Sequence, residues 1–358
     1  MSAPPDTLQP RGFDADRLGR PLRSLRMSIT DRCNLRCGYC MPGEDYQWLP
    51  AQDILSFEEI LRLTGLFADL GADRLRLTGG EPLLRKDADK LVAMLCAAGR
   101  FREVAMTTNG LGLVRHAEAL KAAGLDRLTV SLDSLRPERV AKLSGRDSLG
   151  SVLEGIEAAA DAGFTGTKLD TVVMRGENDD ELPALLAFGA ERDLEVRFIE
   201  YMDVPGATAW RPELVATRLD MLTEIEAAVG VAPEPHGERG SAPAARFRLP
   251  EGASYGGRDL SGQVFGVIAS TSEPFCSDCD RARVTADGMW YLCLYARLGV
   301  NLLELVRSGV SDDELRERLA RGWGERADRG AELRLEETDR GAFAASADPH
   351  LEMHTRGG

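Results

Sequence analysis

Ser28-Ile-Thr-Asp-Arg-Cys-Asn-Leu-Arg-Cys-Gly-Tyr-Cys40 places three cysteines, Cys33, Cys37 and Cys40, directly after a short β-like run. Three thiolates in one compact loop can hold a metal centre. Iron–sulfur clusters and structural zinc sites usually take four protein ligands, so a set of three leaves one position open. At this point zinc or a set of core cysteines remains an alternative, although the loop contains none of the four histidines: His116, His236, His350 and His354.

β-like runs and amphipathic helical windows alternate on both sides of this loop. The β-like runs are residues 25–30, 74–78, 104–108, 127–132, 168–174 and 196–201. The helical windows are residues 56–70, 87–98, 114–123, 148–162 and 179–192. The first window opens with Ser56-x-x-Glu59, a capping-box signature. Strands that alternate with helices predict parallel βα units in a partial or complete barrel, with the chemistry in the loops that follow the strands.

The alternation weakens after residue 205. Here we predict a helix at 221–229, a loop at 233–250, short strands at 247–249 and 264–268, and a helix at 311–321. Ser311-x-x-Glu314 opens that last helix, and the tail from residue 328 is predicted to be irregular. Cys276-x-x-Cys279, followed by Cys293, forms a second group of three cysteines.

The composition of the chain limits the kinds of partner that it can bind. The chain of 358 residues has 44 Lys and Arg against 58 Asp and Glu, a net charge of −14. A negative field repels nucleic acid, and an anionic substrate needs a local group of cations. Residues 1–20 lack the apolar stretch of a signal peptide, and the longest apolar run, 91–98, is far shorter than the ~20 residues of a membrane span. We therefore expect a cytoplasmic protein with no membrane or nucleic-acid partner, whose cysteines stay reduced.

The first cysteine loop resembles the signature of radical S-adenosylmethionine (SAM) enzymes, including the aromatic Tyr39 before the third cysteine. The segment Thr78-Gly-Gly-Glu-Pro82 resembles their GGEP segment, whose glycines we expect to let the backbone approach the methionine part of SAM.

From about residue 19 to 358 the chain is similar to the GTP 3′,8-cyclases, which begin molybdenum cofactor biosynthesis. The resemblance rests on the first cysteine loop, Arg76-Leu-Thr-Gly-Gly-Glu-Pro, Thr107-Thr-Asn-Gly, Val130-Ser-Leu-Asp, Arg197-Phe-Ile-Glu, the second cysteine group and the terminal Gly-Gly. It implies an α/β fold, an incomplete (βα)6 radical SAM barrel closed by a C-terminal α+β domain. The implied parts are an N-terminal extension (1–20), the barrel (21–205) and the C-terminal domain (206–358).

The resemblance also implies the cofactors, SAM and two [4Fe–4S] clusters. The SAM cluster would be held by Cys33, Cys37 and Cys40, and the substrate cluster by Cys276, Cys279 and Cys293. The residues implied to surround SAM are Tyr39, Gly80, Ser131 and Met202.

The residues implied to bind GTP are Arg26, Arg76, Thr107, Lys168, Arg281, Ala282 and Arg283, with Arg197 as a further member. Arg26 and Arg76 also stand out by themselves, because they lie in short apolar runs where an unpaired charge is costly. Arginine suits bidentate phosphate contacts, whereas lysine acts as a point charge. The catalytic residues implied are Arg26, Arg281, Arg283 and the terminal Gly357 and Gly358.

The reaction implied is reductive cleavage of SAM to a 5′-deoxyadenosyl radical, which removes the ribose 3′ hydrogen of GTP before the carbon radical attacks guanine C8. The implied partners are GTP, an external electron donor, the downstream cyclic pyranopterin monophosphate synthase and, as a homodimer, a second copy of the chain. The chain departs from the family pattern at Arg74, usually Lys, and at the polar residues 354–356 before Gly-Gly. The alternatives are another radical SAM enzyme with an auxiliary cluster, and a zinc-binding interaction module.

Overall fold

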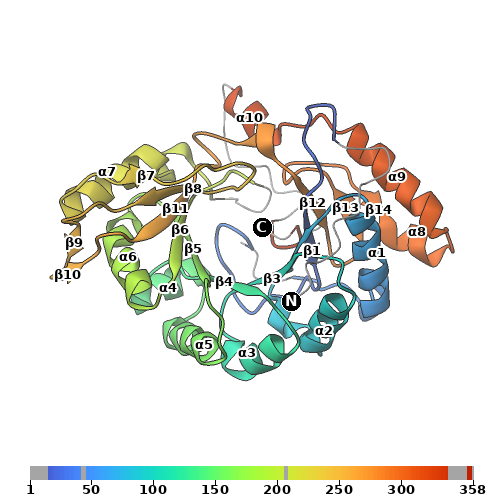
Figure 1. Ribbon diagram of the computed structural model, residues 1–358, viewed down its shortest axis with the longest axis horizontal. Helices are drawn as coiled ribbons and strands as arrows, with labels where there is room; N and C mark the ends of the chain where they lie inside the picture. The colour runs from blue at the N-terminus through green and yellow to red at the C-terminus, as the bar shows by residue number, and fades with distance from the viewer. Residues whose placement is uncertain (1–14, 42–45, 205–208, 338–352, 357–358) are drawn as a thin grey trace, which may run out of the picture.

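A single curved sheet organises the chain. The computed structural model describes residues 15–41, 46–204, 209–337 and 353–356. Within them, twelve strands form one sheet in the order β14-β13-β12-β1-β2-β3-β4-β5-β6-β11-β8-β7. The sheet bends into an arc, with helices along its outer side (Figure 1).

Six parallel strands and the helices that lie between them in the sequence make up the middle of this arc. The strands, all parallel to their neighbours, are β1 (Ser24–Ser28), β2 (Arg74–Thr78), β3 (Glu103–Thr108), β4 (Arg127–Ser131), β5 (Lys168–Val173) and β6 (Glu195–Glu200). The helices are α1 (Phe57–Asp69), α2 (Ala88–Ala97), α3 (Leu113–Ala122), α4 (Pro137–Ser144), α5 (Leu149–Asp161) and α6 (Leu182–Glu191). All six predicted strands and the five predicted helices are confirmed, with ends that differ by at most three residues. Helix α4 is not among the predicted elements.

The C-terminal part continues the same sheet at both edges. Strand β12 (Arg281–Val284) pairs in parallel with β1, and β11 (Val264–Ile268) pairs in parallel with β6. Antiparallel strands follow on each side: β13 (Met289–Tyr291) and β14 (Val300–Asn301) beyond β12, and β8 (Ala245–Arg248) and β7 (Glu234–Pro235) beyond β11. The barrel is therefore extended by strands from the far end of the chain.

The remaining elements are a hairpin, β9 (Ser254–Tyr255) and β10 (Arg258–Asp259), and the helices α7 (Arg218–Val229), α8 (Leu302–Arg307), α9 (Asp312–Gly324) and α10 (Gly330–Leu335). The predicted helices at 221–229 and 311–321 are confirmed. The predicted strands at 247–249 and 264–268 are confirmed as β8 and β11, although β8 begins two residues earlier and ends one earlier. The predicted loop at 233–250 is wrong at β7 and at the start of β8, and the predicted irregular tail is wrong at α10. These short elements depend on pairing and packing with distant residues, which local patterns do not encode.

Two reciprocal hydrogen bonds fix the start of helix α1. Ser56 accepts a hydrogen bond from the Glu59 backbone at 3.1 Å, and the Glu59 carboxylate accepts one from the Ser56 backbone at 2.7 Å. The predicted capping box at α1 is confirmed.

Among the described residues, no helix combines the length and apolar character that a bilayer-spanning segment needs.

Alternation along the strands separates the core from the inside of the arc. Leu25 and Met27 of β1 are fully buried in the hydrophobic core, while Arg26 lies on the opposite face of the strand. Arg26 is in register with Arg76 on β2 and with Arg283 on β12. Charged side chains within apolar-looking runs thus lie on the inner face, where Arg26 and Arg283 line a cavity.

Candidate active site

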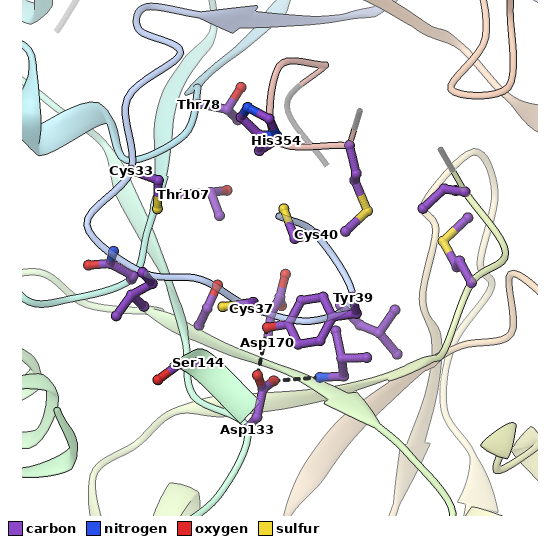
Figure 2. Close-up of a pocket in the computed structure, with 18 of the residues that line it drawn as sticks. Cys33, Cys37, Tyr39, Cys40, Thr78, Thr107, Asp133, Ser144, Asp170 and His354 are labelled. Carbon is purple, nitrogen blue, oxygen red and sulfur yellow. Dashed lines mark hydrogen bonds between the residues drawn. The ribbon is translucent and has the colours of Figure 1, made fainter. Parts of the chain in front are cut away.

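The loop after β1 carries the first cysteine group to the ends of the parallel strands. Cys33, Cys37 and Cys40 line a cavity of about 280 Å³ (Figure 2). Helix α4 holds this loop, because Arg36 N–H donates to the Ser144 carbonyl at 2.8 Å. Burial raises the pKa of the Cys33 and Cys37 thiols. Cation binding would offset this effect, since the thiolate is the ligand form.

The Gly79-Gly80 segment packs against the backbone of the cysteine loop. Gly80 N–H donates to the Thr30 carbonyl at 2.9 Å, and a Cβ at Gly80 would lie 2.3 Å from the Arg32 carbonyl oxygen. A Cβ at Gly79, where φ is +149°, would lie 2.4 Å from the Thr30 carbonyl oxygen. The close contact between these two loops of the protein therefore requires both glycines. Gly80 also lines the cavity.

A tyrosine–aspartate pair lies on the wall beside the first cysteine group. Tyr39 donates from its hydroxyl to Asp133 Oδ2 at 2.6 Å, and the other carboxylate oxygen of Asp133 accepts from Val172 N–H at 2.9 Å (Figure 2). Burial raises the pKa of Asp133 to about 6, although the Tyr39 hydrogen bond opposes this rise. Asp133 is not among the site residues predicted from the sequence, but it lies in the quoted motif Val130-Ser-Leu-Asp.

The second cysteine group lines a smaller cavity of about 80 Å³. Cys276 lies in a 3₁₀ turn, Cys276–Asp278, and accepts hydrogen bonds from the backbone of Ala331 and Glu332 at the start of α10. Burial raises the pKa of Cys293 to about 11. Burial also opposes ionisation of Cys279, but nearby guanidinium groups outweigh it and lower the pKa of that thiol to about 7; they belong to Arg281 and Arg326.

The two cavities adjoin. The residues that line both are Met202, Ser270, Phe275, Arg281, Arg283 and Leu294. Both cysteine groups, which are more than 230 positions apart in the sequence, therefore face one continuous region. This arrangement is the central geometric feature of the site.

Cations are concentrated at the wall that the two cavities share, which carries Arg281 and Arg283, and beside it at Arg26. Arg26, Arg281, Arg283 and Thr107 line the larger cavity. Burial lowers the pKa of Arg26 well below its ordinary value, and the charges of Arg283 and Arg281 lower it further. Burial and the charge of Arg281 likewise lower the pKa of Arg283 to about 10. Like charges that depress one another inside a cavity are typical of an anion-binding site.

Four further residues implied to bind GTP lie outside the described lining of the two cavities: Arg76, Lys168, Ala282 and Arg197. Arg76 donates to the hydroxyls of Thr107 and Thr129, at 3.1 and 3.0 Å. Lys168 and Arg197 both pair with Glu195, at 3.4 and 3.1 Å. Burial, followed by the charge of Arg197, lowers the pKa of Lys168 to about 8. The side chain of Ala282 is fully buried in the hydrophobic core, on the opposite face of β12 from Arg281 and Arg283.

The residues implied to surround SAM, Tyr39, Gly80, Ser131 and Met202, all line the larger cavity. Asp170 lines it as well and is not among the predicted residues. Its Oδ1 atom is buried and has no hydrogen-bond partner among the described residues. Because Asp170 is a polar residue within the predicted strand 168–174, its alternation with the apolar positions is the signal that could have identified it.

The polar residues before the terminal glycines dock inside the arc. Thr355 accepts a hydrogen bond at its carbonyl from Ser28 Oγ at 2.8 Å, and His354 lines the larger cavity. Arg356 is buried, and its carbonyl accepts a hydrogen bond from Arg283. Gly357 and Gly358 lie outside the described residues.

The cysteine groups fit iron–sulfur clusters by their chemistry, since each offers three thiols to a common cavity. Among the described residues, no three His, Cys, Asp or Glu side chains converge closely enough to hold a single metal ion. A four-iron cluster is wider than one ion, so its thiolate ligands lie farther apart than the ligands of a single ion. Three thiols that line one cavity therefore fit such a cluster even though they do not converge on one point.

Two family models match consecutive parts of the chain. Residues 27–189 match the Radical SAM superfamily, and residues 194–332 match Molybdenum Cofactor Synthesis C. Among solved structures, Streptococcus suis SuiB bound to S-adenosylmethionine superimposes with a TM-score of 0.56 at 18% identity, covering 88% of this chain and 67% of that chain. That similarity supports the radical SAM fold.

Curated relatives narrow the family. GTP 3′,8-cyclase 1 of Mycobacterium tuberculosis (strain ATCC 25618 / H37Rv) is 50% identical over 370 residues, covering 100% of both chains. GTP 3′,8-cyclase of Streptomyces coelicolor is 46% identical over 318 residues, covering 88% of this chain and 90% of the relative. Together with the radical SAM fold and the two cysteine groups around one cavity, this identity shows that the chain belongs to the GTP 3′,8-cyclase family of radical SAM enzymes.

Proposed function

We propose that this chain converts GTP to (8S)-3′,8-cyclo-7,8-dihydroguanosine 5′-triphosphate, the first step of molybdenum cofactor biosynthesis. The observation that supports this proposal best is the shared wall between the two cavities, where Arg281 and Arg283 lie between the cysteine groups. A nucleotide held there would extend from one group to the other, with its phosphates on buried cations.

Cys33, Cys37 and Cys40 would hold one [4Fe–4S] cluster, and Cys276, Cys279 and Cys293 a second. When bound, the first cluster and SAM supply the 5′-deoxyadenosyl radical chemistry. The residues that would surround SAM are Tyr39, Gly80, Ser131 and Met202, which all line the larger cavity. Asp170 offers a buried acceptor, Oδ1, to a hydroxyl or amino donor of a bound nucleoside.

The chain itself binds, orients and shields the substrate. Arg26, Arg281 and Arg283 would contact the triphosphate, while Arg76 fixes the Thr107 hydroxyl on the cavity wall. Overall, the hydrogen atom at C3′ is transferred to the 5′-deoxyadenosyl radical and gives 5′-deoxyadenosine, a C3′–C8 bond forms, and one electron and one proton complete the product. An external donor would supply this electron and the one that cleaves SAM. The enclosing strands keep water away from the reacting atoms.

Anaerobic incubation of the reconstituted protein with GTP, SAM and dithionite tests this function. We expect GTP-dependent 5′-deoxyadenosine and a cyclised nucleotide, identified by mass spectrometry. 5′-Deoxyadenosine that forms at the same rate without GTP would instead favour another radical SAM enzyme. Iron and sulfide analysis distinguishes the enzyme from the zinc-binding interaction module. Two cubane clusters need about eight irons per chain, whereas a zinc module contains no sulfide.

A further inference from the structure

A buried pair of arginines from opposite ends of the chain lies behind the second cysteine group. Arg20 and Arg326 are each 2% exposed. Arg20 Nη1 donates to the carbonyl of Cys276 at 2.8 Å, and Arg326 Nη1 donates to the carbonyl of Cys279 at 2.7 Å. The two guanidinium groups thus hold the two ends of the Cys276–Cys279 turn.

Asp16 sets the position of Arg20. Its Oδ1 atom accepts hydrogen bonds from the backbone N–H groups of Leu18 and Arg20, both at 2.9 Å. Its Oδ2 atom accepts from Arg20 Nε at 2.6 Å and lies 3.7 Å from Arg326 Nη1. One buried carboxylate therefore folds a tight turn and faces both guanidinium groups, which limits the cost of burying them.

Further contacts join this unit to the C-terminal part of the chain. Arg20 Nη1 also donates to the Asp328 carbonyl at 2.8 Å, and Arg326 Nε donates to Asp328 Oδ2 at 3.2 Å. Trp323 Nε1 donates to the Arg20 carbonyl at 3.1 Å, and the Arg326 guanidinium lies 4.6 Å from the centre of the Trp323 ring. Arg326 also contacts the Cys279 side chain.

We infer that Asp16, Arg20 and Arg326 form a positioning unit that presents the thiols of Cys276 and Cys279 to the second cluster. The inference rests on the proposed function in one respect, that this cysteine group binds a cluster. A planar guanidinium presents its N–H donors from three nitrogen atoms in a fixed fork that spans separate oxygens, whereas the donors of a lysine ammonium all leave one nitrogen atom. Residues 16–20 therefore belong functionally to the second cysteine group, although they precede the first strand.

The test measures each cluster separately in the full-length chain. In a Cys33→Ser/Cys37→Ser/Cys40→Ser background, iron and sulfide report the second group alone. In a Cys276→Ser/Cys279→Ser/Cys293→Ser background, they report the first. We expect Arg20→Lys and Arg326→Lys each to remove at least half of the iron in the first background and to leave the second background unchanged.

Arg307→Lys is the matched control. Arg307 also bridges distant parts of the chain, through the carbonyls of Gln52 and Ile54 and the carboxylate of Glu59, and we expect its substitution to leave iron unchanged in both backgrounds. Circular dichroism of every variant reports the fold, and the electron paramagnetic resonance signal of the reduced second cluster should shift in the partly loaded Arg variants.

Full second-group iron in both Arg variants, or an equal loss in both backgrounds, would overturn the inference. If the second cysteine group takes up no cluster in the protein that keeps Arg20 and Arg326, both this inference and the proposed second cluster are wrong. Failure of GTP cyclisation by a protein that carries both clusters would refute only the cyclase function.

Discussion

Arg283 on β12 donates a hydrogen bond from Nη1 to the backbone carbonyl of Arg356, at a distance of 3.0 Å. One residue of the cavity wall therefore also holds the last described segment of the chain, 353–356. Arg356 is held in turn by its own side chain, whose Nη1 atom donates to the Leu294 carbonyl at 2.6 Å and whose guanidinium lies 4.2 Å from the centre of the Tyr291 ring. Residue 294 directly follows Cys293, so the tail and the second cysteine group share a support.

Arg356→Ala should uncouple the tail from this support. A hydrogen bond from a charged donor contributes about 1.5–3 kcal/mol, so we expect GTP-dependent 5′-deoxyadenosine formation to fall about tenfold or more. Iron content should stay at the wild-type level, because the hydrogen bond that is lost goes to the Leu294 carbonyl, while Cys276 and Cys279 keep their contacts with α10 and Arg326. Arg318→Ala, which removes only an exposed pair with Glu314, is the control and should be neutral. Wild-type turnover by Arg356→Ala would contradict a role for the docked tail.

The arginines of the shared wall should make the protein more stable when an anion is bound. Because burial and mutual repulsion lower the pKa of Arg283 on this wall and of Arg26 beside it, bound phosphates relieve an unfavourable charge cluster. At a ligand concentration of 100 times Kd, binding adds about 2.7 kcal/mol to the free energy of unfolding. We expect GTP to raise Tm more than guanosine at equal concentration, with a difference that shrinks as salt screens the charges. Equal shifts from GTP and guanosine would argue against phosphate recognition at this wall.

Lys168 gives the stability of the folded protein a pH dependence. Its pKa is lowered from 10.5 to about 8 by burial and then by the charge of Arg197, so the charged form costs stability. That cost is present below about pH 8 and declines as the pH rises from about 8 toward 10.5, because the folded protein releases the proton first.

GTP affinity should change in the opposite direction if Lys168 contacts the phosphates, as the family resemblance implies, because the anionic phosphates bind the charged lysine more tightly. We expect the Kd of GTP to rise as the pH passes through about 8. Lys168→Arg should flatten this change because arginine remains charged, and Lys168→Met should bind weakly at every pH. A Kd that rises equally in the wild type and in Lys168→Arg would exclude Lys168 as its origin.

The middle of the barrel was predictable because its information is local. Each βα unit has its own alternation, and the capping box Ser56-x-x-Glu59 marks the first helix. The cysteine spacing identified both groups of thiols. Arg26 and Arg76 stood out as charges in apolar runs, and their strands place them in register on the inner face.

The parts that could not be predicted depend on distant pairing. Strand β12 has four residues and acquires its place only by lying parallel to β1. That placement brings Arg281 and Arg283 to the wall and leaves Ala282 in the core. The turn at residues 16–20 likewise has no periodicity, and its role follows from contacts with Cys276 and Asp328.

Gly330 permits the close approach of α10 to the second cysteine group, so enlarging it should affect that group selectively. A Cβ at Gly330 would lie 2.9 Å from Cys293 Sγ and 2.7 Å from Tyr295 Cβ. We expect Gly330→Ala to displace Cys293 and lower the iron bound by the second group, while the first group keeps its iron. Gly150→Ala is the matched control, because a Cβ at Gly150 in α5 meets nothing within 4 Å. That substitution should stabilise the protein by about 0.5–1 kcal/mol, the usual gain from Gly to Ala within a helix. If Gly330→Ala retained both clusters in full, Cys293 would have to move without loss of ligation, and the close contact would not constrain the cluster.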